Sequence, residues 1–320
     1  MRRYTQLTRE QRYQISALLN TGHSLTKIAQ QLGKHKSTIS REIRRNKGQQ
    51  DYCPKKACTL TDKRHKNKPK RRINPYYWEI VKRYLKLHWS PEQISGWLKR
   101  HQIFSISHEL IYKYIYADKQ RGGTLYTHLR RKKKYGKRIN GKSKRGQIPH
   151  RVSIDERPPI VDAKERIGDW EVDTVIGKNH KQAIVSLVER KTKITLIQKV
   201  ENKTADNVKN AIITMLKPFK ELVQTITSDN GKEFAKHDEI AKALNTEFYL
   251  AHPYASWERG LNENTNGLIR QYFPKSSSFT ELSEKDTECV MEKLNNRPRK
   301  TLGFKTPNEV LYEHLMALHL

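Results

Sequence analysis

Three carboxylates in the second half of the chain could together hold divalent cations. Asp173 lies in the run WEVDTVIG, Asp229 in TSDNGKEF, and Glu263 in the polar segment RGLNENTNG. Carboxylate oxygens are ligands that Mg²⁺ prefers, and two such ions about 4 Å apart can activate the attacking oxygen and stabilise the leaving oxygen of phosphoryl transfer. Residues 151–320 contain 25 Asp and Glu in all, so no single acid is informative. The case rests on the elements that would position these three.

The segments around the three acids predict an alternation of strands and helices. Alternating and β-branched runs predict three strands separated by short turns: IGDWEVDTVIG, QAIVSLVER and KITLIQKV. A helix, a strand, a short helix, a strand and a last helix are then predicted: TADNVKNAIITMLKPF, ELVQTITSDNG, a segment to Leu244, TEFYL, and a segment beginning near Ser256. This is the order of the α/β ribonuclease-H-like fold. It would place Asp173 mid-strand, Asp229 at a strand end and Glu263 on the following helix.

Polar residues near these acids could support such a site. Glu171 precedes Asp173 by two residues and therefore shares its face of the strand, although a surface carboxylate is an equal interpretation. Asn262, Asn266 and Arg270 accompany Glu263 on the predicted helix, where residues three or four apart share a face. They predict a polar stripe that faces DNA. For Trp257, packing into the core is the favoured interpretation.

The charge of the chain is unevenly distributed. Residues 1–150 contain 38 Lys and Arg against 8 Asp and Glu, whereas residues 151–320 contain 26 against 25, within a total of +31. A surplus of this size predicts a polyanionic partner, with a solvated basic surface like that of some ribosomal proteins as the alternative. There is no apolar run of roughly 18 residues and no signal peptide. We therefore expect a cytoplasmic, nucleoid-associated protein with no membrane partner.

The first 50 residues predict a helix-turn-helix domain. Thr8 can cap a helix over residues 8–19, Ser24 caps a second helix, and Gly33 provides the turn before a third helix over residues 36–45. A generic three-helix bundle is the alternative. The third helix has few apolar residues and many small polar or basic ones, as insertion into a major groove requires. The predicted DNA contacts are Lys36, Ser37, Thr38, Ser40, Arg41, Arg44 and Arg45.

A second helix-turn-helix is predicted over residues 76–120. SPEQISGWLKR opens with a capping Ser and a Pro in the first turn, and SISHELIYKYIY follows. Its predicted DNA contacts are Ser107, His108, Tyr112 and Lys113. Basic segments over residues 51–75 and 121–158 are predicted to be linkers that follow phosphates. The second of them contributes the candidate contacts Arg130, Arg131 and Lys132.

Three segments of the catalytic half resemble one family. WEVDTVIG, TSDNGKEF and PYASWERGLNENTNGLIRQYFPK resemble the DDE transposases of the insertion-sequence-thirty family, which are related by fold to retroviral integrases. The interval of 33 residues between Asp229 and Glu263 fits that family. LNNRPRKTLGFKTPNEVL resembles the closing segment of these proteins, so the resemblance covers nearly the whole chain, with the catalytic domain over residues 159–320.

The resemblance implies a reaction and its participants. It makes Asp173, Asp229 and Glu263 the catalytic metal ligands, with Asn230 and Gly231 shaping the turn beside the second aspartate. It also implies two Mg²⁺ ions, which Mn²⁺ can replace, a metal-activated water that nicks DNA, and a 3′-hydroxyl that joins the strands. The implied partners are double-stranded DNA of the element's terminal inverted repeats and of the target, and further copies of the chain in a homodimer or larger assembly on DNA.

Two other functions fit parts of the sequence. A non-catalytic DNA-binding regulator could use the C-terminal domain only for assembly, but the three acids at the positions that the fold requires argue against it. A structure-specific nuclease of the same fold would hydrolyse DNA and never join strands. Only strand-transfer products would separate that case from a transposase.

Overall fold

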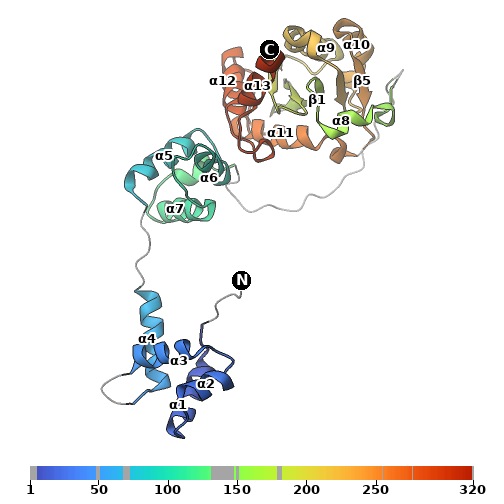
Figure 1. The fold of residues 1–320 in the computed structure, drawn as a ribbon. Helices are drawn as coiled ribbons and strands as arrows, with labels where there is room; N and C mark the ends of the chain where they lie inside the picture. Colours follow the sequence, from blue (N-terminus) through green and yellow to red (C-terminus); the bar gives the residue numbers. More distant parts are fainter. Residues whose placement is uncertain are drawn as a thin grey trace. The chain divides into compact units, whose positions relative to one another are not determined.

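The computed structural model describes residues 6–47, 51–67, 73–130, 148, 151–178, 182–253, 255–275 and 277–318. These residues belong to two compact units, Met1–Ile73 and Asn74–Leu320. Figure 1 shows the ribbon of both units. No helix in the described ranges is long and apolar enough to cross a bilayer.

The first unit is a bundle of short helices. They are α1 (Arg9–Asn20), α2 (Leu25–Gln31), α3 (Lys36–Asn46) and α4 (Pro54–Lys66). Thr8 forms a capping box with Gln11, and Ser24 accepts a hydrogen bond from the backbone of the second helix, as the sequence predicts. Gly33 has a φ of +59°, which lets the chain turn sharply between α2 and α3. The predicted helix-turn-helix is therefore present.

The prediction that residues 51–75 are only a linker is wrong, because Pro54–Lys66 form α4. Ala57 is fully buried in the core of the first unit, and Arg12 on α1 donates a hydrogen bond to Thr61 at 3.3 Å. Arg64 donates a hydrogen bond to Asn46 at the end of α3. The helix buries only a narrow stripe, and the many Lys and Arg residues around it conceal that stripe in the sequence.

The second unit begins with three helices, α5 (Pro75–Lys86), α6 (Pro91–Arg100) and α7 (His108–Gln120), followed by the 3-10 turn η1 (Leu125–His128). The capping box of Ser90 and Gln93 fixes the start of α6. The sequence predicts α6 and α7, whereas α5 was not predicted. The predicted linker over residues 121–158 is also too long. Leu125 and Leu129 are buried, and Ser153 pairs with Leu250 of the sheet.

The second unit also contains a five-stranded mixed sheet in the order β3-β2-β1-β4-β5. The strands are β1 (Asp169–Ile176), β2 (Ala183–Glu189), β3 (Thr195–Val200), β4 (Thr225–Ser228) and β5 (Glu247–Leu250). β1, β2 and β3 are antiparallel, whereas β4 pairs in parallel with both β1 and β5. This order confirms the predicted α/β ribonuclease-H-like class.

Helices cover both faces of the sheet (Figure 1). On one face, α9 (Ala205–Leu216) and α10 (His237–Leu244) pack against a core that includes Val172 and Val185. On the other face, α11 (Gly260–Tyr272) and α12 (Glu284–Asn295) pack against a core that includes Val175 and Ile184. The remaining elements are η2 (Ile154–Glu156), α8 (Pro159–Ala163), η4 (Lys217–Leu222), η5 (Lys232–Phe234), η6 (Ser256–Arg259), η7 (Lys300–Leu302) and α13 (Pro307–Leu318). Side chains alternate along a strand, so Glu171 and Asp173 share the α11 face of β1 with Val175.

Candidate active site

Two of the predicted carboxylates lie side by side on neighbouring parallel strands. Asp173 is the fifth residue of β1, and Asp229 directly follows β4. The register pairs Glu171 with Thr227, so two residues further along each chain Asp173 and Asp229 come opposite one another. One guanidinium contacts both. Arg259 Nη1 is 3.4 Å from Asp173 Oδ2, and Arg259 Nη2 is 3.5 Å from Asp229 Oδ2.

Backbone and side-chain donors orient both carboxylates. Asp173 accepts a hydrogen bond from the N–H of Thr174 at 2.7 Å and from Asn266 Nδ2 at 3.0 Å. Asp229 accepts one from the N–H of Gly231 at 2.9 Å. Burial raises the pKa of Asp173, and the charge of Asp229 raises it further, whereas Arg259 opposes the shift. The two carboxylates together therefore favour the binding of a cation.

Asn230 and Gly231 lie where the family resemblance places them, in the turn after β4. The amide of Asn230 donates a hydrogen bond to the carbonyl of Ala251, which ties the turn to the end of β5. Gly231 has an ordinary φ, but a Cβ at this position would lie 2.4 Å from Glu233 Oε2. A side chain at position 231 would therefore displace a buried carboxylate.

Glu263, the third predicted carboxylate, is exposed on the first turn of α11. Within the described ranges, no three His, Cys, Asp or Glu side chains come close enough to hold a metal ion. Glu263 lies three residues before Asn266, which contacts Asp173, so the two share a helix face. Like charges repel, and an exposed carboxylate beside two others is better solvated apart from them. The structure thus brings together two of the three acids and places the third on the adjacent helix.

The predicted DNA-facing stripe on α11 is wrong, because one member is buried and the side chains of the other two bind the sheet. Asn262 is fully buried. Asn266 accepts a hydrogen bond from Ser186 Oγ at 2.8 Å in addition to contacting Asp173. Arg270 donates a hydrogen bond to the carbonyl of Ile176 at 2.7 Å. These residues hold α11 against β1 and β2, which fixes the helix that carries Glu263.

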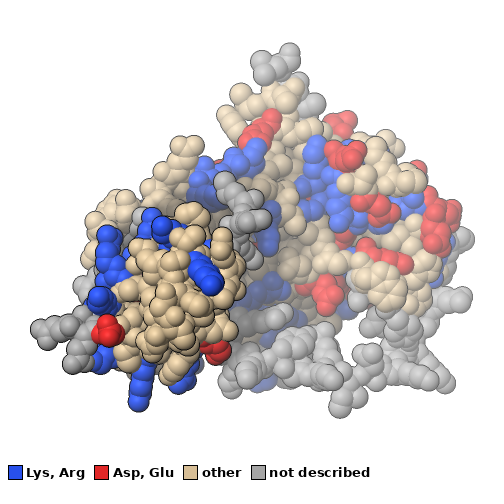
Figure 2. All heavy atoms as spheres, turned by 60° about the horizontal axis from the view of Figure 1, so that its bottom comes forward, with Lys and Arg blue, Asp and Glu red and all other residues tan. Residues whose placement is uncertain are grey.

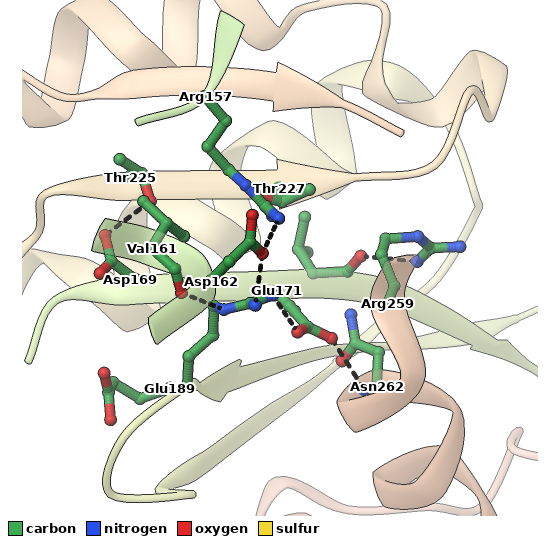
Figure 3. A network of polar contacts seen from close by, with 12 residues as sticks. Arg157, Val161, Asp162, Asp169, Glu171, Glu189, Thr225, Thr227, Arg259 and Asn262 are labelled. Carbon is green, nitrogen blue, oxygen red and sulfur yellow. Dashed lines mark hydrogen bonds and ion pairs between the residues drawn. The ribbon is translucent and has the colours of Figure 1, made fainter. Parts of the chain in front are cut away.

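Glu171 joins β1 to the first turn of α11. It is 1% exposed, so the surface interpretation is excluded. One carboxylate oxygen accepts a hydrogen bond from Arg190 Nη1 at 2.7 Å, and the other accepts one from the N–H of Asn262 at 3.0 Å. Figure 3 shows Glu171 and Asn262 joined across the gap between strand and helix. A carboxylate at a helix N-terminus is favoured by both the free N–H groups and the dipole.

Two charged side chains near the aspartates, Arg259 and Glu233, were not predicted. Glu233 is 8% exposed, accepts a hydrogen bond from the Thr174 hydroxyl at 3.2 Å and pairs with Lys203 at 2.5 Å. Both residues stand within the segments that carry the family resemblance, but neither helical nor strand periodicity reveals that their partners come from distant elements.

Trp257 is 77% exposed, so the interpretation that it packs into the core is wrong. The α-helix starts only at Gly260, after the 3-10 turn η6. A helix that is extrapolated back to Ser256 therefore predicts the wrong direction for the Trp257 side chain.

Trp257 lines a cavity of about 770 Å³ with Lys193 and other polar residues. Burial lowers the pKa of Lys193 to about 8. None of the three candidate catalytic acids lines this cavity.

Most of the predicted DNA contacts on α3 lie at the surface. The side chains of Lys36, Arg41, Arg44 and Arg45 are exposed, and Ser37 and Ser40 are half-buried. Thr38 is half-buried and lines a groove with Arg12 and Thr61. The helical unit at the bottom of Figure 1 comes forward in Figure 2, where Lys and Arg side chains lie around it and acidic ones are few. This distribution fits a surface for nucleic-acid phosphates.

The contacts predicted for the second helix-turn-helix divide between surface and structural positions. Ser107 caps α7 by accepting a hydrogen bond from the N–H of Leu110, and Tyr112 is half-buried. His108 is half-buried beside Glu109, whereas Lys113 is exposed. Arg130 donates a hydrogen bond to Asn264 at 2.9 Å. Arg131 and Lys132 lie outside the described residues.

Comparisons with known proteins agree with this architecture. Residues 3–46 match a helix-turn-helix domain family, and residues 163–256 match the integrase core domain family. The transposase for insertion sequence element IS4351 of Bacteroides fragilis is 48% identical, over 95% of this chain and 94% of its own length. The transposase InsI for insertion sequence element IS30A of Escherichia coli (strain K12) is 37% identical, over 95% of this chain and 83% of its own length. The catalytic core domain of BIV integrase aligns with 48% of this chain and 99% of its own, with 21% identity and a TM-score of 0.38.

Proposed function

The chain belongs to the IS30 family of insertion-sequence transposases, and on that premise we propose that Asp173, Asp229 and Glu263 are its catalytic metal ligands. It is a DNA-binding enzyme that cleaves and transfers DNA strands in transposition, and its integrase core belongs to a metal-dependent class. The finer assignments are two Mg²⁺ ions, replaceable by Mn²⁺, and the terminal inverted repeats of the element as the DNA that is recognised.

The observation that carries this proposal is the pair of aspartates around one positive charge. Asp173 and Asp229 come from adjacent parallel strands, and both carboxylates point to the guanidinium of Arg259. A position where two carboxylates meet a cation has the donor chemistry that Mg²⁺ or Mn²⁺ needs. Glu263 would complete the set from α11, since it shares a face with Asn266, which already contacts Asp173.

The residues of this chain provide the scaffold for phosphoryl transfer. Bound divalent cations would supply the positive charge that activates the attacking oxygen and stabilises the leaving one. The N–H groups of Thr174 and Gly231 fix the direction of the two carboxylates, and Glu171 fixes the start of the helix that carries Glu263. No side chain is assigned as a nucleophile. Water would therefore be the attacking group in cleavage, and the DNA 3′-hydroxyl in joining.

Recognition of the element ends is assigned to the exposed face of α3. Lys36, Arg41 and Arg44 lie along that face and have the length and charge to reach phosphates and base edges in a major groove. One catalytic site in each chain and two ends in each element imply at least a dimer on DNA. Target DNA would be bound by the same assembly.

A strand-transfer assay tests the proposed function. Labelled DNA carrying the element ends is incubated with the protein and Mg²⁺, and the products are separated on denaturing gels. We expect 3′-end nicks and longer, joined products. Hydrolysis alone would indicate a nuclease of the same fold, and binding without any cleavage would indicate a regulator.

Binding of the ends should depend steeply on salt, because many Lys and Arg side chains would replace counterions on phosphates. We expect affinity to fall by about 10³-fold between 50 and 200 mM salt if six or more phosphates are contacted. Replacing the exposed Arg44 with Ala should reduce the slope of log affinity against log salt by about one. The exposed Lys217 of the catalytic domain provides the control, and Lys217→Ala should leave the slope unchanged. An affinity that is insensitive to salt would contradict phosphate binding by the basic half.

A further inference from the structure

Arg259 lies between two of the proposed metal ligands, Asp173 and Asp229. Its guanidinium is within 3.5 Å of both Asp173 Oδ2 and Asp229 Oδ2, and its side chain is 11% exposed. Nη1 also donates a hydrogen bond to the carbonyl of Val172 at 3.3 Å. Figure 3 shows the Arg259 side chain extending toward β1 from the start of the α11 helix. The two aspartates thus share one internal cation.

The charge of Arg259 bears on metal binding at the two aspartates. A guanidinium stays charged at every pH that a protein tolerates. A divalent ion bound to the same carboxylates would stand within a few ångströms of that charge, and two like charges at such a distance repel strongly. Arg259 also forms ion pairs with one oxygen atom of each carboxylate that the ion would use. The guanidinium and a divalent cation therefore compete for Asp173 and Asp229.

We propose that Arg259 is a built-in counter-ion of the catalytic site, which neutralises Asp173 and Asp229 before metal binds and must leave them when a divalent cation takes its place. The proposal rests on the proposed function, because it takes the two aspartates as metal ligands. Arg259 ends the short turn η6, directly before α11. A local change of that turn can therefore withdraw the side chain without moving the helix. The consequence is that metal affinity is held below what the carboxylates alone would give.

Titration of the full-length chain with Mn²⁺ in the absence of DNA tests this competition. We expect Arg259→Gln to bind Mn²⁺ about tenfold more tightly than the parent, because the competing charge is gone. Arg259→Lys keeps the charge and should stay within about threefold of the parent. Parent-like affinity in Arg259→Gln would overturn the proposal.

Arg166, which lies three residues before β1, provides a matched control. It donates two hydrogen bonds of 2.9 Å to Asp169, which lies four residues before Asp173 on β1. Arg166→Gln therefore removes an arginine from an aspartate of this strand without touching the proposed metal ligands. We expect its Mn²⁺ affinity to equal that of the parent. A gain as large as that of Arg259→Gln would show a general effect of charge and would overturn the specific one.

The double variant Asp173→Asn/Asp229→Asn separates failure of this inference from failure of the proposed function. If the double variant binds Mn²⁺ as the parent does, the aspartates are not the metal ligands and both proposals fail. If the double variant loses Mn²⁺ binding but Arg259→Gln binds like the parent, only the counter-ion inference fails. Loss of Mn²⁺ binding in the double variant together with tighter Mn²⁺ binding in Arg259→Gln supports both proposals.

A second measurement needs no substitution at Arg259, so it remains valid if Arg259→Gln does not fold. Phenylglyoxal modifies accessible arginines, and mass spectrometry gives the rate at each position. In the parent chain, saturating Mn²⁺ should raise the rate at Arg259 severalfold, because the side chain leaves the two carboxylates. The rate at Arg166 should not change. An Arg259 rate that stays constant or falls with Mn²⁺ would overturn the proposal.

Discussion

Asp173→Asn, Asp229→Asn and Glu263→Gln should each reduce metal-dependent DNA cleavage by about 10³-fold or more. Each substitution replaces a charged oxygen ligand with a neutral amide of nearly the same shape, so the effect reports on charge and coordination and not on packing. Binding of the element ends should be unchanged, because the proposed contacts lie on α3 in the other unit. Cleavage on gels and end binding by mobility shift, measured on the same preparations, check both halves of the prediction.

Glu258→Gln is the matched control for Glu263→Gln. Glu258 stands five residues earlier, and its carboxylate accepts hydrogen bonds of 2.8 Å from the backbone N–H and the ring of His252. An amide oxygen can still accept from the backbone N–H, so we expect cleavage close to that of the parent. Loss of cleavage in Glu258→Gln together with its retention in Glu263→Gln would show that the third ligand has been assigned to the wrong turn.

The elements that carry the two aspartates could be predicted from the sequence, because they follow from the alternation and order of the strands. Alternation predicted the strands that carry Asp173 and Asp229, and the order of elements predicted a ribonuclease-H-like fold with Asp173 mid-strand and Asp229 at a strand end. In the structure their parallel register brings the two residues opposite one another. The family resemblance added Glu263, whose place on the helix is correct although its contact with the pair is not seen.

The contacts at the N-terminus of α11 could not be predicted, because the 3-10 turn η6 changes the direction of the side chains that precede the helix. η6 precedes α11, so residues before Gly260 do not follow the 100° spacing of the helix that the sequence suggested. Trp257 consequently faces outward and Arg259 turns to the aspartates. Asn262 is buried, and its N–H donates a hydrogen bond to Glu171, which is far away in the sequence. Helical periodicity contains no information about such a partner.

The start of α4 shows the same limit in the first unit. Ala57 is the one fully buried residue of a helix otherwise covered with Lys, Arg and polar side chains. Arg12 on α1 and Asn46 on α3 form hydrogen bonds with Thr61 and Arg64 of this helix. Composition alone therefore favours a linker, and only the tertiary partners make the segment a helix.

Glu171→Ala should lower the free energy of unfolding by about 3 to 5 kcal/mol, the largest stability loss we expect from a single polar residue of this domain. Arg190 is 4% exposed and would lose the carboxylate that lies 2.7 Å from its Nη1, keeping only Asp162 and the carbonyl of Val161. The N–H of Asn262 would lose its acceptor at the same time. Removing one member of a buried ion pair is costly because the other charge stays desolvated.

Urea unfolding of the full-length chain measures this loss, and the exposed Glu165 provides the matched control. Glu165 lies just before β1 at the surface, so Glu165→Ala should change stability by no more than about 0.5 kcal/mol. Glu171→Gln keeps an acceptor for the N–H of Asn262 and should fall between the two, since it loses only the charge opposite Arg190. Equal unfolding free energies for Glu171→Ala and Glu165→Ala would show that β1 and α11 are held together without this carboxylate. In that case the position of Glu263 would depend on Asn266 and Arg270, whose hydrogen bonds to Asp173 and to the carbonyl of Ile176 are the other polar ties between α11 and β1 described above.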